Sequence, residues 1–208
     1  DENIKNIEKS QKKLISYFKN KNVWVASSTH KYEEMFCAKT HIELKKKYKN
    51  LITIIIPRHI HRTNKIVSEI KRLNLNVVKH SSNTRSLKEV DIYIVDRFGE
   101  TKKFHKISSS VFFGGSIIDR GGQNPLEAAR YGARILHGQN IDNFKDIYKL
   151  LGTLKISKKI NTPKQLASMI VFKKNKNIGV KIKNIGAKIL KKTIKELNYQ
   201  INDELKKT

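Results

Sequence analysis

One segment of the sequence combines two glycine pairs with a helix start, a pattern suited to binding a phosphate. Gly114-Gly115 and Gly121-Gly122 permit backbone conformations closed to other residues, and they let backbone N–H groups approach a ligand closely. Asn124 is predicted to be the N-cap of the following helix, with Pro125 as its first residue and Glu127 as its third. Because first-turn N–H groups and the positive end of the helix dipole attract anions, we expect a phosphorylated ligand here.

A purely structural turn explains the same residues. Asn-Pro-x-Glu is also a common start of a capped helix, and glycine pairs occur in many tight turns. Glu127 has two interpretations as well, because its carboxylate can accept hydrogen bonds from a ribose diol or complete a capping box. The candidate phosphate loop consists of Gly114, Gly115, Ser116, Gly121 and Gly122.

The chain is strongly basic, with 44 Lys and Arg against 18 Asp and Glu and a net charge of +26 over 208 residues. Such a charge favours nucleic acid or an anionic membrane surface as a partner. The lysines are spread along the chain with many Ile and Asn residues, which indicates A/T-rich coding as another source of the charge. The lysine runs lack interleaved aromatic residues, and no zinc-finger, helix-turn-helix or RNP pattern is present, so we expect no specific nucleic-acid binding.

Residue types that hold metals are sparse. Cys37 is the single cysteine, which excludes an internal disulfide and a thiolate cluster. His30, His59 and His61 lack the spacing of a zinc site, so we expect neither a metal nor another cofactor. The apolar stretches are shorter than the roughly 18 residues of a membrane span, and no signal peptide is recognisable, so we expect a soluble piece of a longer protein.

The elements that would position these residues follow an alternating pattern. Apolar β-branched segments alternate with segments of helical period, which predicts an α/β fold with a Rossmann-like, doubly wound parallel sheet and extra terminal helices. Strands are expected at 22–26, 51–56, 76–79, 92–95, 110–113 and 134–136. Helices are expected at 29–48, 62–73, 99–107, 125–131, 143–151 and 163–172. The predicted divisions are an amphipathic N-terminal helix or linker (1–21), the Rossmann-like domain (22–172) and a basic segment of one or two helices (173–208).

Ligands of open parallel sheets bind beyond the carboxyl ends of the strands, where polar residues follow four predicted strands. Arg58 comes directly after a strand that Pro57 ends, and its planar guanidinium suits a phosphate or a base carbonyl. Gly99 allows a base edge to approach the backbone beside Phe98. The structural alternatives are a solvated arginine at position 58 and an ordinary first-turn helix residue at Glu100.

Taken together, these motifs resemble the C-terminal half of the bacterial 3-deoxy-D-manno-octulosonic acid (Kdo) transferases, which are inverting glycosyltransferases of the two-domain GT-B type. The resemblance covers about residues 22–172 and is carried by residues 26–30, 33–34, 57–59, 99–100, 113–116, 121–129 and 143–144. In that family this half binds CMP-Kdo. The resemblance implies that CMP contacts Pro57, Arg58, Phe98, Gly99, Glu100, Asn124, Pro125, Leu126 and Glu127.

The resemblance also implies a reaction and its location. The family transfers Kdo to a lipid A precursor (lipid IVA) in lipopolysaccharide biosynthesis, without a metal, at the cytoplasmic face of the inner membrane. The catalytic base and the acceptor site are expected in an N-terminal domain outside these residues, so this chain is expected to be inactive alone. Its basic surface would then attract the phosphorylated acceptor and the anionic membrane.

The sequence departs from the family pattern beside the expected site. Asp96-Arg97-Phe98 replaces the usual Asp-Thr-Met, and Gln123 replaces a histidine. Two other functions compete with this interpretation. A UDP-sugar-binding half of another GT-B enzyme would prefer UMP or UDP over CMP, and a basic nucleic-acid-binding module would bind oligonucleotides with a steep salt dependence.

Overall fold

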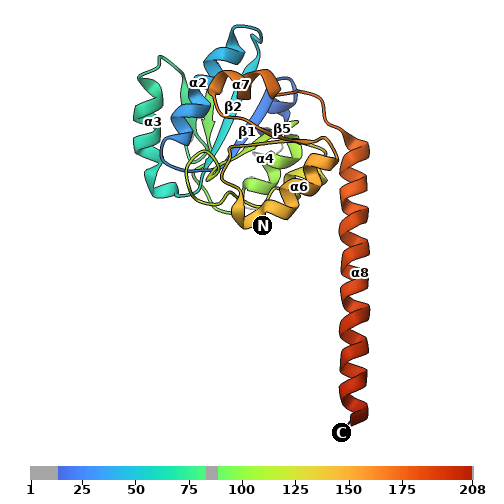
Figure 1. The fold of residues 1–208 in the computed structure, drawn as a ribbon. Coiled ribbons are helices and arrows are strands. Elements are labelled where there is room, and N and C mark those ends of the chain that lie inside the picture. Colours follow the sequence, from blue (N-terminus) through green and yellow to red (C-terminus); the bar gives the residue numbers. More distant parts are fainter. Residues whose placement is uncertain (1–13, 83–88, 208) are drawn as a thin grey trace, which may run out of the picture.

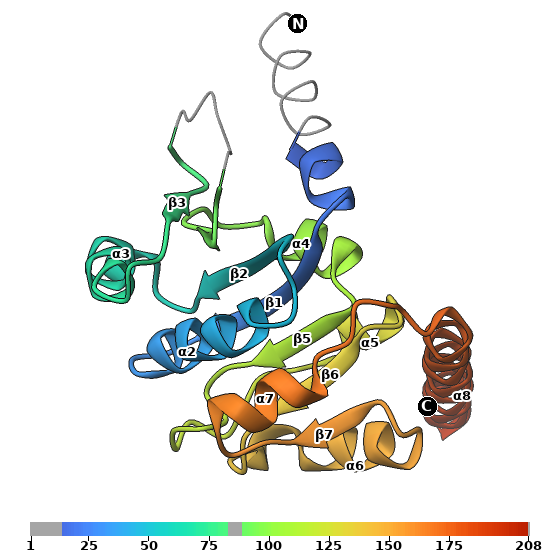
Figure 2. The same cartoon turned by 90° about the horizontal axis from the view of Figure 1, so that it is seen from above.

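A parallel sheet forms the centre of the computed structural model, which describes residues 14–82 and 89–207. The seven strands have the order β3-β4-β2-β1-β5-β6-β7, and all six neighbouring pairs are parallel. Helices cover both faces of the sheet, and one long helix projects from the domain (Figure 1, Figure 2). The predicted doubly wound α/β class is therefore confirmed.

The strands follow the apolar segments of the sequence closely. They are β1 (Asn22–Thr29), β2 (Leu51–Pro57), β3 (Val77–Lys79), β4 (Ile92–Ile94), β5 (Ser110–Phe113), β6 (Arg134–His137) and β7 (Ser157–Lys159). Every residue of β2 is buried because helices lie on both faces, which explains its unbroken apolar run. The sequence prediction missed β7, because this edge strand is short and carries two exposed lysines.

The helices also follow the prediction, with shifted ends. They are α2 (Glu33–Lys45), α3 (Thr63–Lys71), α4 (Thr101–Ile107), α5 (Leu126–Arg130), α6 (Lys145–Thr153), α7 (Pro163–Met169) and α8 (Lys176–Lys207). Single 3-10 turns lie at η1 (Ile60–Arg62) and η2 (Asp142–Phe144). The helix predicted over 29–48 begins four residues later, because β1 continues to Thr29 and the backbone turns at Ser28 and Tyr32, both at positive φ.

Each face of the sheet has its own apolar core, because side chains alternate across a strand. Trp24 and Ala26 of β1 face the core under α2, α3 and α7. Val23 and Val25 face the opposite core under α4, α5 and α6. Residues 14–19 are helical and place Phe18 in this second core, and residues 20–21 form a turn before β1. Residues 1–13 of the predicted N-terminal helix lie outside the described residues.

The basic C-terminal segment forms the single helix α8 of 32 residues. Its first turns pack against α5, where Ile182 is buried and Gly179 allows the backbone of Arg130 to come close. The remainder projects away from the domain (Figure 1). Within the described parts of the chain, no helix is long and apolar enough to span a membrane.

Candidate functional site

The loops after β1, β2, β4 and β5 meet at the carboxyl edge of the sheet, where the predicted site residues lie. Pro57 is the buried last residue of β2, and Arg58 follows it with an exposed side chain. The N–H of Arg58 donates to the carbonyl oxygen of Thr29 at 2.9 Å, which joins the ends of β1 and β2. The guanidinium of Arg58 therefore extends into solvent from a rigid strand end.

A cluster of cationic side chains surrounds His30 in this edge. Burial, together with the positive charges of His59, Arg120, Arg58 and Arg62, lowers the pKa of His30. The Nε2 atom of His30 is buried without a hydrogen-bond partner among the described residues. Since cations gathered near one point repel each other, an anion bound between them would be stabilised.

The arginines of this cluster differ in what they bind. Arg62 forms a bidentate pair with the buried Glu34, with N···O distances of 2.9 and 3.3 Å. Arg58 and Arg120 have no carboxylate partner within residues 14–82 and 89–207. Two guanidinium groups are thus available to an anionic ligand.

The first glycine pair is occupied by a carboxylate from its own chain. Glu33 is completely buried, and its carboxylate accepts hydrogen bonds from the N–H groups of His30, Gly115, Ser116 and Ile117 at 2.7–3.1 Å. Burial raises the pKa of Glu33, and these four donors partly offset that effect. In this arrangement the N–H groups of Gly115 and Ser116 hold α2 in place and are not free for a phosphate.

Gly114 and the hydroxyl of Ser116 are also committed to the fold. A Cβ atom on Gly114 would lie 2.4 Å from the carbonyl oxygen of Ser28. The Ser116 hydroxyl donates to the carbonyl oxygen of Phe113 and accepts from the N–H of Gly138. These residues of the candidate phosphate loop shape the edge of the sheet, and their polar groups face the protein.

The second glycine pair offers free donors. Gly121 and Gly122 both have positive φ, at 70° and 75°, and the Gly122 N–H donates to the carbonyl oxygen of Gly115. Among the described residues, no hydrogen bond occupies the N–H groups of Gly121, Gln123 and Asn124. The adjacent free amides of Gln123 and Asn124, together with the amide of Gly121, are donors of the kind that bind an anion in a glycine turn. Of the candidate loop, this is the part whose geometry suits a phosphate.

The helix after the glycine turn begins one residue later than predicted. Pro125, predicted as the first helical residue, precedes α5, and the helix starts at Leu126. Pro125 is therefore the N-cap residue that the sequence placed at Asn124, and the Oδ1 atom of Asn124 accepts the N–H of Leu126 at 3.0 Å. Since α5 has only five residues, its dipole is short, and the free amides of the turn are the stronger attraction for an anion.

Glu127 does not complete a capping box. Its Oε1 atom lies 2.9 Å from Nδ1 of His105, and its side chain is 47% exposed. The other ring nitrogen of His105, Nε2, lies 3.1 Å from Oγ of Ser27. The Glu127 carboxylate therefore lies at the edge of the site, with one oxygen hydrogen-bonded to His105 of α4.

The loop before α4 presents an open backbone. Gly99 has a φ of 79°, and a Cβ atom placed there would meet nothing within 4 Å. Phe98 beside it is 77% exposed. Glu100 lies 2.7 Å from Nζ of Lys103 and 3.7 Å from Nε2 of His80, so its carboxylate is already paired inside the protein. An exposed ring beside an open backbone suits the approach of a planar base.

Sequence reasoning missed several residues of this edge. Arg120 lies between the glycine pairs and was not considered, although an arginine within a glycine turn is a visible signal. The bridging role of His105 had no local signal, because its partners are 22 and 78 residues away. Asn143, in contrast, is one of the residues that carry the resemblance in the sequence, and it supports the second glycine turn by donating its backbone N–H to the carbonyl oxygen of Gly121.

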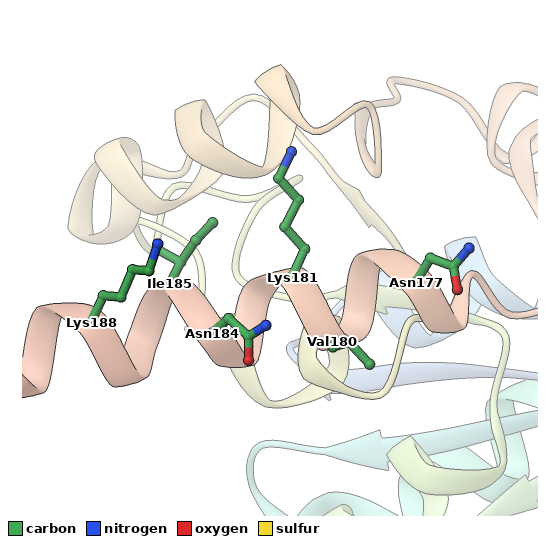
Figure 3. A pocket seen from close by; sticks show the side chains of 6 residues that line it. All are labelled: Asn177, Val180, Lys181, Asn184, Ile185 and Lys188. Atoms are coloured by element: carbon green, nitrogen blue, oxygen red, sulfur yellow. The ribbon is translucent and has the colours of Figure 1, made fainter.

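Other parts of the structure offer less chemistry. In residues 14–82 and 89–207, no group of three or more His, Cys, Asp and Glu side chains is arranged to hold a metal ion. An open groove of about 370 Å³ lies on α8, and Figure 3 shows the side chains that line it. All of its lining residues belong to that helix, and none comes from the loops after the strands: Asn177, Val180, Lys181, Asn184, Ile185 and Lys188.

Comparison with known proteins adds the following findings. The chain is 34% identical over 192 residues to the 3-deoxy-D-manno-octulosonic acid transferase of Rickettsia bellii, covering 92% of this chain and 45% of that protein. It is 32% identical over 129 residues to the Haemophilus influenzae transferase of the same name, covering 62% of this chain and 30% of that protein. The chain thus spans less than half the length of either relative. No family model matches it.

A solved structure shares the fold. The C-terminal CMP-Kdo binding domain of WaaA from Acinetobacter baumannii superposes with a TM-score of 0.68 at 24% identity, covering 74% of this chain and 80% of that one. The similarity to a Kdo transferase over 92% of the chain confirms the resemblance found in the sequence, and the solved domain shares the chain's fold.

Proposed function

We propose that the chain is the donor-binding domain of a Kdo transferase and binds CMP-Kdo at the carboxyl edge of its sheet. The observation that carries this proposal is the pair of unpartnered arginines beside a glycine turn with three free N–H groups. A nucleoside monophosphate sugar with a carboxylate has two anionic groups, and such a site offers donors to both. The names of the relatives support the choice of CMP-Kdo over other donors.

The parts of CMP fit separate parts of the edge. The turn at Gly121 and Gly122, together with Arg58, receives the phosphate. The free oxygen of Glu127 accepts a ribose hydroxyl. The open backbone at Gly99 and the ring of Phe98 receive the cytosine, since a base edge can pair with backbone groups while its face packs on a ring.

The proposed reaction transfers Kdo to a lipid A precursor with inversion and without a metal. This domain would stabilise the charge that develops on the departing CMP phosphate, which is a form of electrostatic catalysis. A carboxylate in the N-terminal domain would remove the proton of the acceptor hydroxyl. Basic side chains on this domain would favour the cytoplasmic leaflet of the bacterial inner membrane, because anionic lipids attract lysine and arginine.

Arg58 provides the first test of the proposed site. Arg58→Ala should weaken CMP binding by about 1.5–3 kcal/mol, the usual contribution of a hydrogen bond to a charged group. Arg58→Lys should restore only part of this loss, because an ammonium group lacks the bidentate fork. Arg72→Ala, which removes an exposed arginine at the end of α3, is the matched control. Isothermal titration calorimetry with CMP measures all four proteins, and equal affinities would refute a contact at Arg58.

Titration with other ligands separates the competing functions. CMP should bind more tightly than UMP and UDP, whereas a UDP-sugar enzyme would show the reverse order. A nucleic-acid module would bind oligonucleotides tightly, with a logarithm of affinity that falls steeply and linearly with the logarithm of salt concentration. The chain alone should transfer no Kdo, and joining it to its native N-terminal domain should restore transfer without added metal. Turnover by the 208 residues alone would contradict this division of roles.

A further inference from the structure

His105 is a buried residue whose two ring nitrogens both have side-chain partners. It is 3% exposed and lies on α4. Its Nδ1 atom contacts Oε1 of Glu127 on α5 at 2.9 Å, and its Nε2 atom contacts Oγ of Ser27 on β1 at 3.1 Å. One side chain therefore connects the two helices whose first turns border the proposed nucleotide site with the central strand of the sheet.

The partners determine where the proton of His105 lies. A carboxylate only accepts hydrogen bonds, so Nδ1 carries the proton directed at Glu127, and Nε2 accepts the hydroxyl of Ser27. Burial lowers the pKa of His105, and the hydrogen bond to Glu127 partly opposes this. The ring is thus held as one neutral tautomer that donates to Glu127.

Only one oxygen of Glu127 is used inside the protein. Oε1 is held by His105, and the described residues provide no hydrogen bond to Oε2. The side chain is 47% exposed and stands three residues beyond Asn124, next to the turn with free amides. An unattached glutamate would lose rotamer freedom on binding a ligand, whereas an anchored one has lost it already.

We propose that His105 is a positioning residue for the nucleotide, holding the Glu127 carboxylate so that Oε2 faces a ribose hydroxyl. This inference rests on the proposed binding of CMP. It accounts for the polar bridge from the buried His105 of α4 to the half-exposed Glu127 of α5. It also makes His105 a determinant of selection for ribose over deoxyribose.

Two substitutions at His105 separate its two hydrogen bonds. Asparagine places an amide nitrogen at the same bond distance from Cβ as Nδ1, so His105→Asn can still donate to Glu127. Glutamine places its amide at the position of Nε2, so His105→Gln can reach Ser27 and leaves Glu127 unanchored. The two variants have the same kinds of polar atoms, so they differ mainly in which partner is retained.

The readout is the ratio of affinities for CMP and deoxy-CMP, measured by calorimetry. The wild-type chain should prefer CMP by about tenfold or more, as expected for a hydrogen bond to a charged group. His105→Asn should keep most of this preference, and His105→Gln should lose it, as Glu127→Gln should. His41→Gln is the matched control, because this second buried histidine contacts Thr53 and Asp91 at the opposite edge of the sheet.

The outcomes distinguish this inference from the proposed function. If the wild-type chain binds no CMP, both the proposed function and the positioning role of His105 are refuted. If it binds CMP and the Asn and Gln variants behave alike, whether both keep or both lose the ribose preference, the positioning role alone is overturned. NMR of nitrogen-labelled histidine in the wild-type chain gives a test that needs no variant to fold. The inference requires the tautomer protonated at Nδ1, and the opposite tautomer overturns it.

Discussion

Glu33→Gln tests whether the carboxylate of Glu33 organises the edge of the sheet. Glu33 is fully buried and accepts four backbone N–H groups, two on each oxygen. Glutamine has nearly the same shape but offers only one acceptor oxygen. Whichever way the amide is oriented, two buried N–H groups then face an NH₂ group and lose their acceptor.

The expected magnitude follows from those two lost hydrogen bonds. A buried donor left without an acceptor costs about 1–3 kcal/mol, so the pair costs about 2–6 kcal/mol. Glutamine also avoids the cost of burying a charge, which is what raises the pKa of Glu33, and this gain offsets part of the loss. We therefore expect a net loss in the lower half of that range, about 2–3 kcal/mol.

Thermal unfolding and hydrogen exchange together test this reasoning. For a domain of this size, a loss of about 2–3 kcal/mol lowers Tm by about 4–12 °C. Hydrogen exchange should accelerate at the amides of Gly115, Ser116 and Ile117, which donate to Glu33. Glu43→Gln changes an exposed carboxylate paired with Lys46 and should leave Tm and exchange unchanged. If Glu33→Gln behaves like this control, the carboxylate does not hold the glycine loop.

Two further predictions concern the stability of the fold. Burial raises the pKa of Asp91, but hydrogen bonds from His41 and Lys45 outweigh this effect and hold the pKa well below its usual range. The stability that this group contributes is therefore present above the unfolded-state pKa of about 3.9 and is lost as pH falls below it. Urea unfolding between about pH 5 and 2 should show this loss in the wild type and a flatter profile in Asp91→Asn; parallel profiles would contradict the role of Asp91. Gly114→Ala should lower Tm strongly, because its Cβ would lie 2.4 Å from the carbonyl oxygen of Ser28. Gly152→Ala in α6 should raise stability by about 0.5–1 kcal/mol, because a Cβ there meets nothing within 4 Å. Equal changes in Tm for Gly114→Ala and Gly152→Ala would contradict the close contact at Gly114 and the open space at Gly152.

Periodicity and residue type determined most of the architecture. Six of the seven strands were located from apolar β-branched runs. Inner strands such as β2 are buried on both faces and must be apolar throughout, and the edge strand β3 was found from Val77 and Val78. The edge strand β7 had no such run. The placement of Arg58 at the carboxyl edge also followed from sequence, because Pro57 ends a strand and parallel strands all end at the same edge.

Tertiary structure alone decided what the polar groups of the edge bind. The sequence indicated that the amides around Gly115 were suited to an anion, and the anion they bind in this structure is Glu33, which lies 82 residues earlier in the chain. Similarly, the carboxylate of Glu127 binds His105 on α4, 22 residues earlier in the chain, and does not complete the capping box that the sequence suggested. Hydrogen-bond partners so distant in sequence have no periodic signal, because the two segments lie side by side only in the folded structure. Local sequence can therefore predict which polar groups need a hydrogen-bond partner. The packing of distant segments determines which of these groups remain free to bind a ligand.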